Sequence, residues 1–180
     1  MGLSTGERRR AKNVIRVEAS GAIDEANSVI GLARVATTID PDSARLDAML
    51  LCVQNDLFDF CTYLCMPESD AKPDPEAMFI VPSQVDRLER NINELSVGLV
   101  PLVSFVLPGG SLAAKALHLA RSVICRAERI LVALSNEPGK TINESTLKYI
   151  NRLSDFLFVA ARHVNRSGES DIIWVPRQTE

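Results

Sequence analysis

The sequence lacks the features that mark several large classes of protein. It has no excess of charge of one sign, since 20 Lys and Arg residues stand against 23 Asp and Glu residues among 180. A mild acidic balance spread along a chain gives no general field that attracts nucleic acid, so we expect no nucleic-acid partner. The chain is 46% hydrophobic. A chain of this length and composition is not disordered and can bury a full core as one domain.

Long apolar segments are absent as well. The longest stretch without charge, 95–114, is interrupted by Pro101, Pro108, Gly109 and Gly110, so it cannot form a membrane-spanning helix of about 20 residues. The first residues, MGLSTGERRRAKN, carry positive charge, but no apolar block follows them, and they are therefore not a secretory signal. We expect no membrane segment and a cytoplasmic location.

The four cysteines, at positions 52, 61, 65 and 125, contain no CxxC pair. Cys61 and Cys65 lie four residues apart, which on a helix places both on one face. The two histidines, His118 and His163, are remote in the sequence, so we reject a metal site there. Free cysteines are among the most often buried residues, which favours reduced thiols packed in a core.

Apolar residues recur at spacings of three and four in five segments, a pattern typical of amphipathic helices. The predicted helices cover 18–35, 46–64, a segment from a Ser83 cap to about residue 95, a segment from a Ser111 cap to about residue 134, and a last one ending near residue 163. Residues 66–78 contain three prolines and predict an exposed loop. No segment is predicted as a strand. The fold class expected is all-α, a five-helix antiparallel bundle in one domain over 1–180.

Two of these helices carry lines of residues that core packing does not explain. On the fourth helix, a mostly polar face lies opposite an apolar stripe; the face holds His118, Arg121, Cys125 and Glu128, and the stripe holds Leu112, Ala116, Leu119, Val123, Ala127 and Ile130. On the fifth helix, a similar line consists of Asn151, Asp155, Phe158, Arg162 and Asn165. Such faces lie either in water or at a subunit boundary, where Arg side chains can hold phosphate groups. Both interpretations are open on the residues alone.

Several long motifs occur in a fixed order. They are TGERRRAK at 5–12, RVEASGAIDEANSVIGLA at 16–33, FVLPGGSLAAKALHLARSVICRAER at 105–129, NRLSDFLFVAARHVN at 151–165 and WVP at 174–176. Over nearly the whole chain this order resembles the PduO-type ATP:cob(I)alamin adenosyltransferases. The resemblance implies a homotrimer of five-helix bundles with active sites between subunits. There the 5′-deoxyadenosyl group of ATP is transferred to cob(I)alamin, which gives adenosylcobalamin and triphosphate.

The same resemblance implies roles for individual residues. Asp24 is expected to bridge to Arg121 of a neighbouring subunit, and Phe105 to keep the lower axial ligand off the cobalt. Beside these catalytic residues, ATP is expected to contact Lys12, Arg121, Arg126 and Glu128. Cobalamin, a substrate, is expected to contact Phe105, Asn151, Asp155 and Phe158. Mg²⁺ is expected with ATP, with no metal-ligating protein residue; the candidate protein partners are a corrinoid reductase and an adenosylcobalamin-dependent mutase or dehydratase.

Two features depart from the family pattern. The nucleotide-side segment 1–15 reads as truncated, because no loop of the form Y-T-x-T-G-D-x-G-x-T precedes TGERRRAK, whereas 166–180 is expected to be a C-terminal tail. Cys125 stands where the family typically carries an Arg, and losing one such contact costs about 2 to 4 kcal/mol of transition-state stabilisation. The alternative function is therefore a weakened paralogue that binds or delivers a corrinoid without using ATP. A helical interaction bundle without a ligand ranks last.

Overall fold

The computed structural model of the chain describes residues 15–65, 79–138 and 142–177. This part contains α1 (Ile15–Ile39), a short 3-10 helix η1 (Pro41–Ser43), α2 (Ala44–Cys65), α3 (Pro82–Ser96), β1 (Val106–Leu107), α4 (Leu112–Ser135), α5 (Glu144–His163) and β2 (Ile172–Ile173). The predicted five-helix bundle is confirmed. The expectation of no strand is wrong, and the loop predicted at 66–78 lies outside the described residues.

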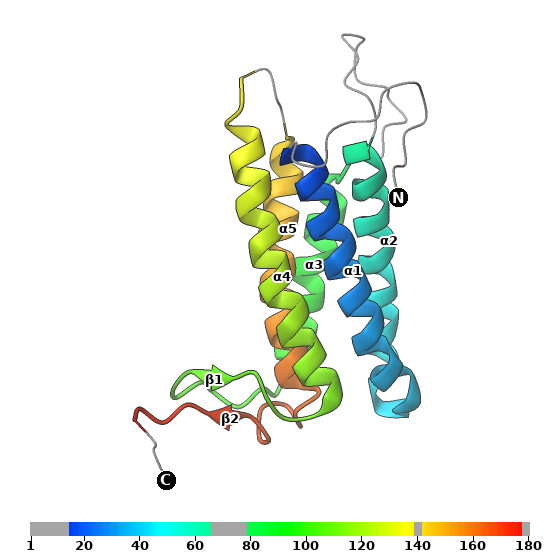
Figure 1. The fold of residues 1–180 in the computed structure, drawn as a ribbon. Helices are drawn as coiled ribbons and strands as arrows, with labels where there is room; N and C mark the ends of the chain where they lie inside the picture. Colours follow the sequence, from blue (N-terminus) through cyan, green and yellow to red (C-terminus); the bar gives the residue numbers. More distant parts are fainter. Residues whose placement is uncertain (1–14, 66–78, 139–141, 178–180) are drawn as a thin grey trace.

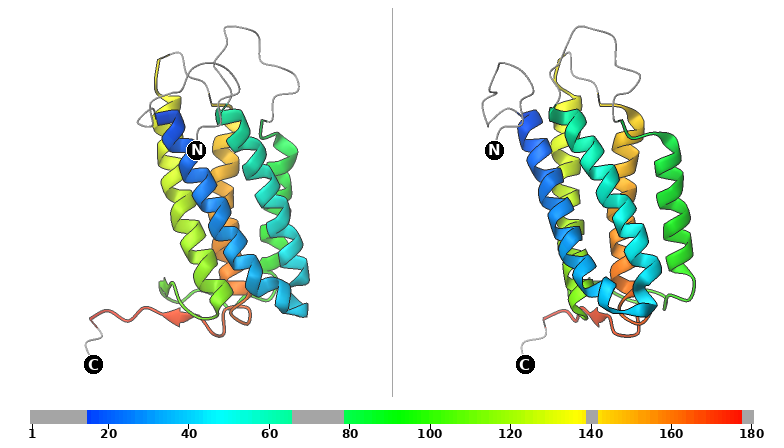
Figure 2. Two further views of the ribbon diagram at one scale, coloured as in Figure 1. Left: turned by 45° about the vertical axis from the view of Figure 1, so that its right-hand side comes forward. Right: turned by 90° about the vertical axis from the view of Figure 1, so that its right-hand side faces the viewer.

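The five helices lie side by side in one bundle (Figures 1 and 2). The principal contacts join α1 to α2 and α4, and α5 to α4 and α3. α4 therefore lies between α1 and α5, while α2 packs on α1 and α3 packs on α5. This placement gives α4 two seams, one along α1 and one along α5.

The core follows the predicted periodicity on most helices. On α1 the predicted stripe is buried throughout, from Ala19 to Ala33. On α2 the residues predicted to face the core, from Leu46 to Leu64 at spacings of three and four, are buried as well. The largest side chains with almost no exposure include Phe60, Tyr149 and Phe156. Their burial on α2 and α5 supplies the hydrophobic stabilisation that a chain of this size needs.

The predicted apolar stripe of α4 is partly wrong. Leu112 and Leu119 are 68% and 53% exposed, although the stripe assigned them to packing. The fully buried leucines and isoleucine of α4 are Leu117, Ile124, Leu131 and Leu134. Because α4 contacts helices on two sides, its buried surface is wide and extends toward the face that the sequence suggested was polar.

Side-chain caps fix where two helices begin. The Ser111 hydroxyl accepts a hydrogen bond from the backbone N–H of Ala114 at 3.1 Å, as predicted for the start of α4. The Asn143 side chain accepts a hydrogen bond from the N–H of Thr146 at 2.7 Å and begins α5. The cap predicted at Ser83 is wrong, because α3 begins at Pro82, whose missing N–H costs nothing at a first helical position.

A buried carboxylate joins three helices. Asp56 of α2 is 5% exposed and accepts hydrogen bonds from Gln84 of α3 at 2.7 Å and from the Tyr149 hydroxyl of α5 at 2.6 Å. Arg87 of α3 forms an ion pair with the same carboxylate. Burial and the nearby Asp56 charge raise the pKa of Tyr149 well above its usual value, so the phenol stays protonated and donates to Asp56.

The two short strands form an antiparallel pair at one end of the bundle (Figure 1). Val106 pairs with Ile173 and Leu107 with Ile172, which brings the segment before α4 against the segment after α5. Strands of two residues leave no periodic signal in a sequence, and their pairing depends on contacts between distant residues.

Two further observations concern the described residues. None of the described helices is long and apolar enough to cross a membrane.

The four cysteines are unpaired, but only Cys61 and Cys125 are half-buried, whereas Cys52 and Cys65 are exposed. The expectation that the thiols pack in the core is therefore wrong for two of them. Burial raises the pKa of the Cys61 thiol, which lies 3.1 Å from the Ser20 hydroxyl.

Candidate functional site

The seam between α4 and α5 brings together residues assigned to different substrates. Asn151 of α5 donates a hydrogen bond to Glu128 of α4 at 3.0 Å. Glu128 is half-buried and Asn151 is exposed, so the pair lies at the surface of the bundle. The sequence placed Glu128 on the ATP side and Asn151 on the cobalamin side, and the structure puts the two side chains in direct contact.

Farther along the same seam, Phe158 of α5 lies beside His118 of α4, with ring centroids 6.0 Å apart. His118 is 2% exposed, and its Nε2 atom has no hydrogen-bond partner among the described residues. Burial and the positive charge of Arg121 lower the pKa of His118 below its usual value. A neutral imidazole and a phenyl ring therefore form a weakly polar wall at this end of the seam.

Arg121 lies one turn after His118 on α4 and is half-buried. Its Nε atom is buried and has no hydrogen-bond partner among the described residues. A buried guanidinium N–H without an acceptor costs free energy, and such groups in folded proteins usually have a partner. Arg121 is therefore the cation of this face that is best placed to bind an anionic group that does not belong to the same chain.

The other seam of α4 holds a different cation. Arg126 forms an ion pair with Glu25 of α1, and both side chains are about half exposed. Asp24, the neighbour of Glu25, is exposed and has no hydrogen bond or ion pair within the described part of the chain. Asp24 and Arg121 are thus not joined to each other in one subunit. Lys12, predicted to bind ATP, lies outside the described residues.

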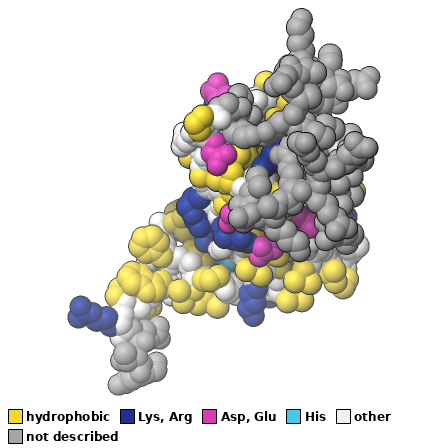
Figure 3. Space-filling model, turned by 45° about the horizontal axis from the view of Figure 1, so that its top comes forward, with side chains coloured by type: hydrophobic (Ala, Val, Ile, Leu, Met, Phe, Trp, Pro, Cys, Tyr) yellow, Lys and Arg dark blue, Asp and Glu magenta, His cyan; other side chains and the backbone are white. Residues whose placement is uncertain are grey.

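Phe105 lies at the end of the bundle, immediately before β1. Its side chain is 77% exposed, and its ring meets Trp174 edge-on with the centroids 5.8 Å apart. Hydrophobic side chains gather around this strand pair, as Figure 3 shows beside the C-terminal segment. The exposed members of this surface are Leu102, Val103, Phe105, Leu107, Ile172, Ile173, Trp174 and Val175. An exposed apolar surface of this kind is typical of a binding site.

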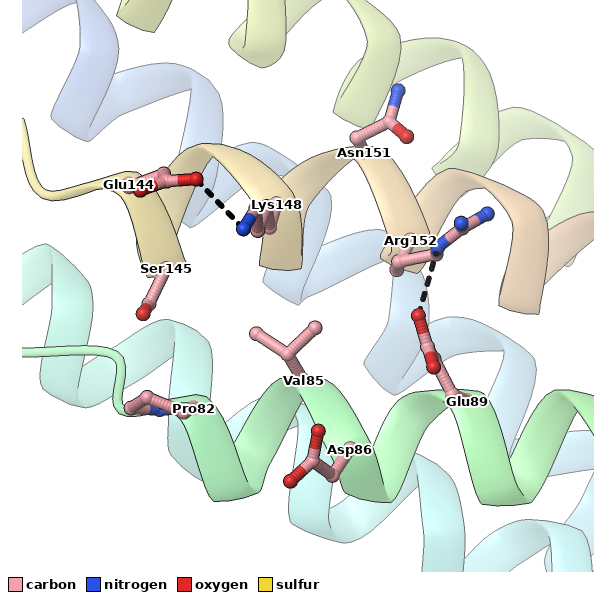
Figure 4. A pocket seen from close by; sticks show the side chains of 9 residues that line it. All are labelled: Pro82, Val85, Asp86, Glu89, Glu144, Ser145, Lys148, Asn151 and Arg152. Atoms are coloured by element: carbon pink, nitrogen blue, oxygen red, sulfur yellow. Dashed lines mark ion pairs between the residues drawn. The ribbon is translucent and has the colours of Figure 1, made fainter.

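The clefts found in the described chain do not coincide with the predicted site. One of about 550 Å³ lies between α3 and α5, and Figure 4 shows its ion pairs, Glu144 with Lys148 and Arg152 with Glu89. Of the predicted residues only Asn151 lines it. A second cleft, of about 330 Å³, lies between α2 and α3. The other described residues predicted for the site lie on α4, on α5 and before β1, apart from Asp24, which lies on α1.

The remaining predicted residue, Asp155, is exposed and forms an ion pair with Arg152 of its own helix at 3.0 Å. Within the described ranges no group of three or more His, Cys, Asp or Glu residues could hold a metal ion. The carboxylates predicted for the site, Asp24, Glu128 and Asp155, lie on three different helices. A Mg²⁺ ion that arrives with phosphate oxygens needs only one or two such carboxylates, so the residues present fit an ion carried by a nucleotide.

Comparison with known proteins shows the family of this chain. Residues 2–164 match the family described as cobalamin adenosyltransferase. This chain belongs to the cobalamin adenosyltransferase family. The corrinoid adenosyltransferase of Bacillus subtilis is 41% identical over 165 residues, which cover 91% of this chain and 82% of that protein. The cobalamin adenosyltransferase of Cupriavidus metallidurans is 40% identical and covers 96% of this chain and 87% of its own length.

A solved structure of this adenosyltransferase family has the same fold. It is a variant of a PduO-type ATP:corrinoid adenosyltransferase from Lactobacillus reuteri, complexed with cobalamin and ATP. The TM-score is 0.83 and the sequence identity 34%, over 95% of this chain and 89% of that one. The five-helix bundle is therefore the adenosyltransferase fold, and its family assignment from the sequence motifs is confirmed.

Sequence reasoning missed some residues of this adenosyltransferase bundle that surround the predicted site. The sequence did not assign a role to Trp174, which contacts Phe105, or to Asp171, which accepts a hydrogen bond from Arg162 at 2.7 Å. Arg162 and Asn165 did belong to the noted line on the fifth helix. That line was the only signal for them, and it could not reveal their partners because those lie in the loop before α4 and the segment after α5.

Proposed function

We propose that this protein transfers the 5′-deoxyadenosyl group of ATP to cob(I)alamin and so forms adenosylcobalamin and triphosphate. The observation that carries the proposal is the match, over 95% of the chain, to a PduO-type adenosyltransferase complexed with cobalamin and ATP. The arrangement of α4 and α5 supports it, because Arg121, whose buried Nε lacks an acceptor within the described chain, lies one turn after His118, and the His118 ring lies beside Phe158.

The reaction needs no nucleophile from the protein. The cobalt of cob(I)alamin supplies the electron pair that forms the bond to the 5′ carbon, the bond from that carbon to the phosphate oxygen breaks, and triphosphate leaves with the electrons. The protein orients the two substrates and stabilises the charge that develops on the leaving group. We assign the second task to Arg121, whose buried Nε lacks an acceptor within the described chain.

The proposed assembly is a homotrimer with sites between subunits. The exposed Asp24 on α1 and the half-buried Arg121 on α4 form no hydrogen bond or ion pair with each other within the described part of one chain. Each would satisfy the other across a subunit boundary. Such a bridge would hold the guanidinium in place for the triphosphate. Arg126 would contribute to ATP binding only after it separates from Glu25, so we give it a secondary role.

On the corrinoid side we assign Phe105 and Phe158 to an apolar wall that excludes water and the lower axial ligand. Phe105 is exposed at the end of the bundle and is available to a large flat ligand. Asn151 and Asp155 would supply polar contacts at the rim. Mg²⁺ would enter with ATP and neutralise charge on the phosphate oxygens.

We place this activity in the cytoplasm, where ATP is abundant and unpaired cysteines such as the four of this chain stay reduced. A reductase must supply the cob(I) state of the substrate, and adenosylcobalamin-dependent mutases or dehydratases would consume the product.

One observation favours a second candidate function. Cys125 occupies the half-buried position between Arg121 and Glu128 where the family typically carries an Arg, so the site has one cation fewer for triphosphate. A carrier that holds a corrinoid without using ATP would tolerate this loss. Separate equilibrium titrations with MgATP and with cob(II)alamin distinguish the two. The enzyme binds both, whereas the carrier binds only the corrinoid.

A further inference from the structure

The loop that presents Phe105 has little regular structure of its own. Between the end of α3 and the start of α4, the chain forms only the two-residue strand β1. A pair of such short strands is not stable by itself in water. Phe105 is 77% exposed, so burial of its own ring cannot fix the backbone that carries it. Other contacts must hold this loop.

Three side chains at the end of α5 and after it supply those contacts. We call Arg162, Asn165 and Asp171 the loop-anchoring cluster. The Arg162 guanidinium donates to Asp171 at 2.7 Å, and these two side chains are only 7% and 1% exposed. Arg162 also donates to the backbone carbonyl of Val100 at 2.5 Å, at the start of the loop. A buried, hydrogen-bonded ion pair has a defined geometry, because a misplaced partner would leave an uncompensated charge.

Asn165 binds the other end of the loop. It is 1% exposed; its side-chain oxygen accepts from the N–H of Ser111 at 3.0 Å, and its amide donates to the Gly109 carbonyl at 3.3 Å. The same amide donates to Asp171 at 3.2 Å, which joins Asn165 to the ion pair. Gly110 adopts a φ of +93°, and a Cβ there would lie 2.2 Å from the Asn165 side-chain oxygen. The turn before α4 is therefore built around Asn165.

The cluster also controls the segment that pairs with the loop. Asp171 directly precedes β2, and Trp174 follows β2. The N–H of Trp174 donates to the carbonyl of Phe105 at 2.8 Å, and the two rings meet edge-on. Holding Asp171 thus sets the register of β2 against β1, and this register places Trp174 against Phe105.

We propose that Arg162, Asn165 and Asp171 are positioning residues that fix the direction of Phe105 toward the corrinoid. For the role of Phe105 this inference rests on the proposed function. The geometric part, in which the cluster sets the contact of Phe105 with Trp174, stands without any substrate. The cluster acts through the backbone of the loop and of β2, and its side chains need not touch a substrate.

The test uses the full chain and its single tryptophan, Trp174, as a fluorescent reporter of this contact. Asn165→Ala and Asp171→Asn are expected to shift the emission of Trp174 to longer wavelength and to raise its quenching by acrylamide. Far-UV circular dichroism checks that each variant retains its helices. Unchanged emission and quenching in these folded variants would overturn the proposal.

Two further variants keep the test decisive if removal of a buried group unfolds the chain. Gly110→Ala leaves every polar group in place, but its Cβ would clash with the Asn165 side chain. This variant is therefore expected to produce the same shift in Trp174 emission. Asp47→Asn is the matched control. Asp47 accepts two hydrogen bonds from Arg34, each at 2.9 Å, in a less buried ion pair between α1 and α2, and its loss is expected to leave the emission unchanged. An equal shift in this control would contradict a specific role of the cluster.

Steady-state kinetics separate the positioning role from general damage. Asn165→Ala is expected to raise the KM for cob(I)alamin several-fold and to leave the KM for ATP unchanged; an equal rise in both would contradict the proposal. If the wild-type protein transfers no adenosyl group while Trp174 still shifts in the variants, the proposed function fails and the positioning of Phe105 by the cluster stands.

Discussion

Asn151 on α5 donates a hydrogen bond to Glu128 on α4 at 3.0 Å, and this contact links the two sides of the proposed site. Both side chains keep contact with solvent, so the bond contributes little to folding. Its position at the seam gives it a functional meaning, since Glu128 is assigned to the nucleotide and Asn151 to the corrinoid.

We therefore expect Asn151→Ala to impair substrate binding more than stability. The free energy of unfolding should fall by less than about 1 kcal/mol, because an exposed hydrogen bond is replaced by bonds to water. The KM for cob(I)alamin should rise about tenfold, as for a lost polar contact of about 1.4 kcal/mol. Lys148→Ala is the control, because Lys148 lies on the same helix and its one ion pair within the described residues is with the exposed Glu144. A KM in Asn151→Ala equal to that of the control would refute the assignment.

The buried His118 predicts a sensitivity to acid. Burial and Arg121 lower its pKa in the folded protein, and Asp171 acts weakly in the opposite direction. Because the unfolded chain takes up the proton near pH 6.5 and the folded chain only at lower pH, acid favours unfolding. The contribution of His118 to stability is complete above pH 6.5 and is lost as the pH falls through its folded pKa.

The measurement is urea unfolding of wild type and His118→Phe at about pH 7 and about pH 5, which bracket the titration of a free imidazole. The phenylalanine keeps a ring beside Phe158 but cannot be protonated. On acidification, the free energy of unfolding of His118→Phe should fall by less than that of wild type. An equal loss in both proteins would show that other groups cause the effect.

The hydrogen bond to the buried carboxylate of Asp56 predicts that removal of the Tyr149 hydroxyl lowers the free energy of unfolding. Tyr149→Phe leaves the buried ring in place but removes a donor at 2.6 Å from Asp56, so the free energy of unfolding should fall by about 1 to 3 kcal/mol. Tyr63→Phe is the control, because the Tyr63 ring is half-buried and its hydroxyl has no hydrogen bond within the described residues. This substitution should change the free energy of unfolding by less than about 0.5 kcal/mol. Urea denaturation measures both, and equal effects would contradict the role of Asp56.

Cys125 predicts a gain of function. An Arg at this half-buried position would add a cation beside Arg121, so Cys125→Arg should raise kcat/KM for ATP by about tenfold or more. Cys125→Ser, which adds no charge, should leave it within about twofold. Initial rates at varied ATP concentration decide this point. A rate for the Arg variant no higher than for the Ser variant would show that the missing cation does not limit catalysis.

Periodicity predicted most of the fold because the helices are long and amphipathic. The cap at Ser111 and the buried stripe of α1 could both be predicted from local residues. The exposure of Leu112 and Leu119 was not, because it depends on which two helices flank α4. The strands escaped prediction because two residues carry no period, and because Val106 and its partner Ile173 are separated in the sequence by α4 and α5.

The site was predicted mainly from motifs, and the structure brings some of its residues together. Glu128 with Asn151, and Phe158 beside His118, lie on one seam because α4 packs on α5. The Asp24–Arg121 bridge stays a prediction, since it would join two subunits. The anchoring of the loop by Asn165 could not be predicted, because its partners Gly109 and Ser111 are separated from it by the length of two helices.

Anaerobic turnover of the purified protein with MgATP and chemically reduced cob(I)alamin is the decisive test of adenosyl transfer. The spectral change that accompanies formation of the cobalt–carbon bond follows the reaction, and release of triphosphate is measured in the same samples. We expect adenosylcobalamin and triphosphate in equal amounts, above a control without protein, and a strongly reduced rate in Arg121→Ala. Corrinoid binding without either product would contradict the adenosyltransferase function and support the carrier.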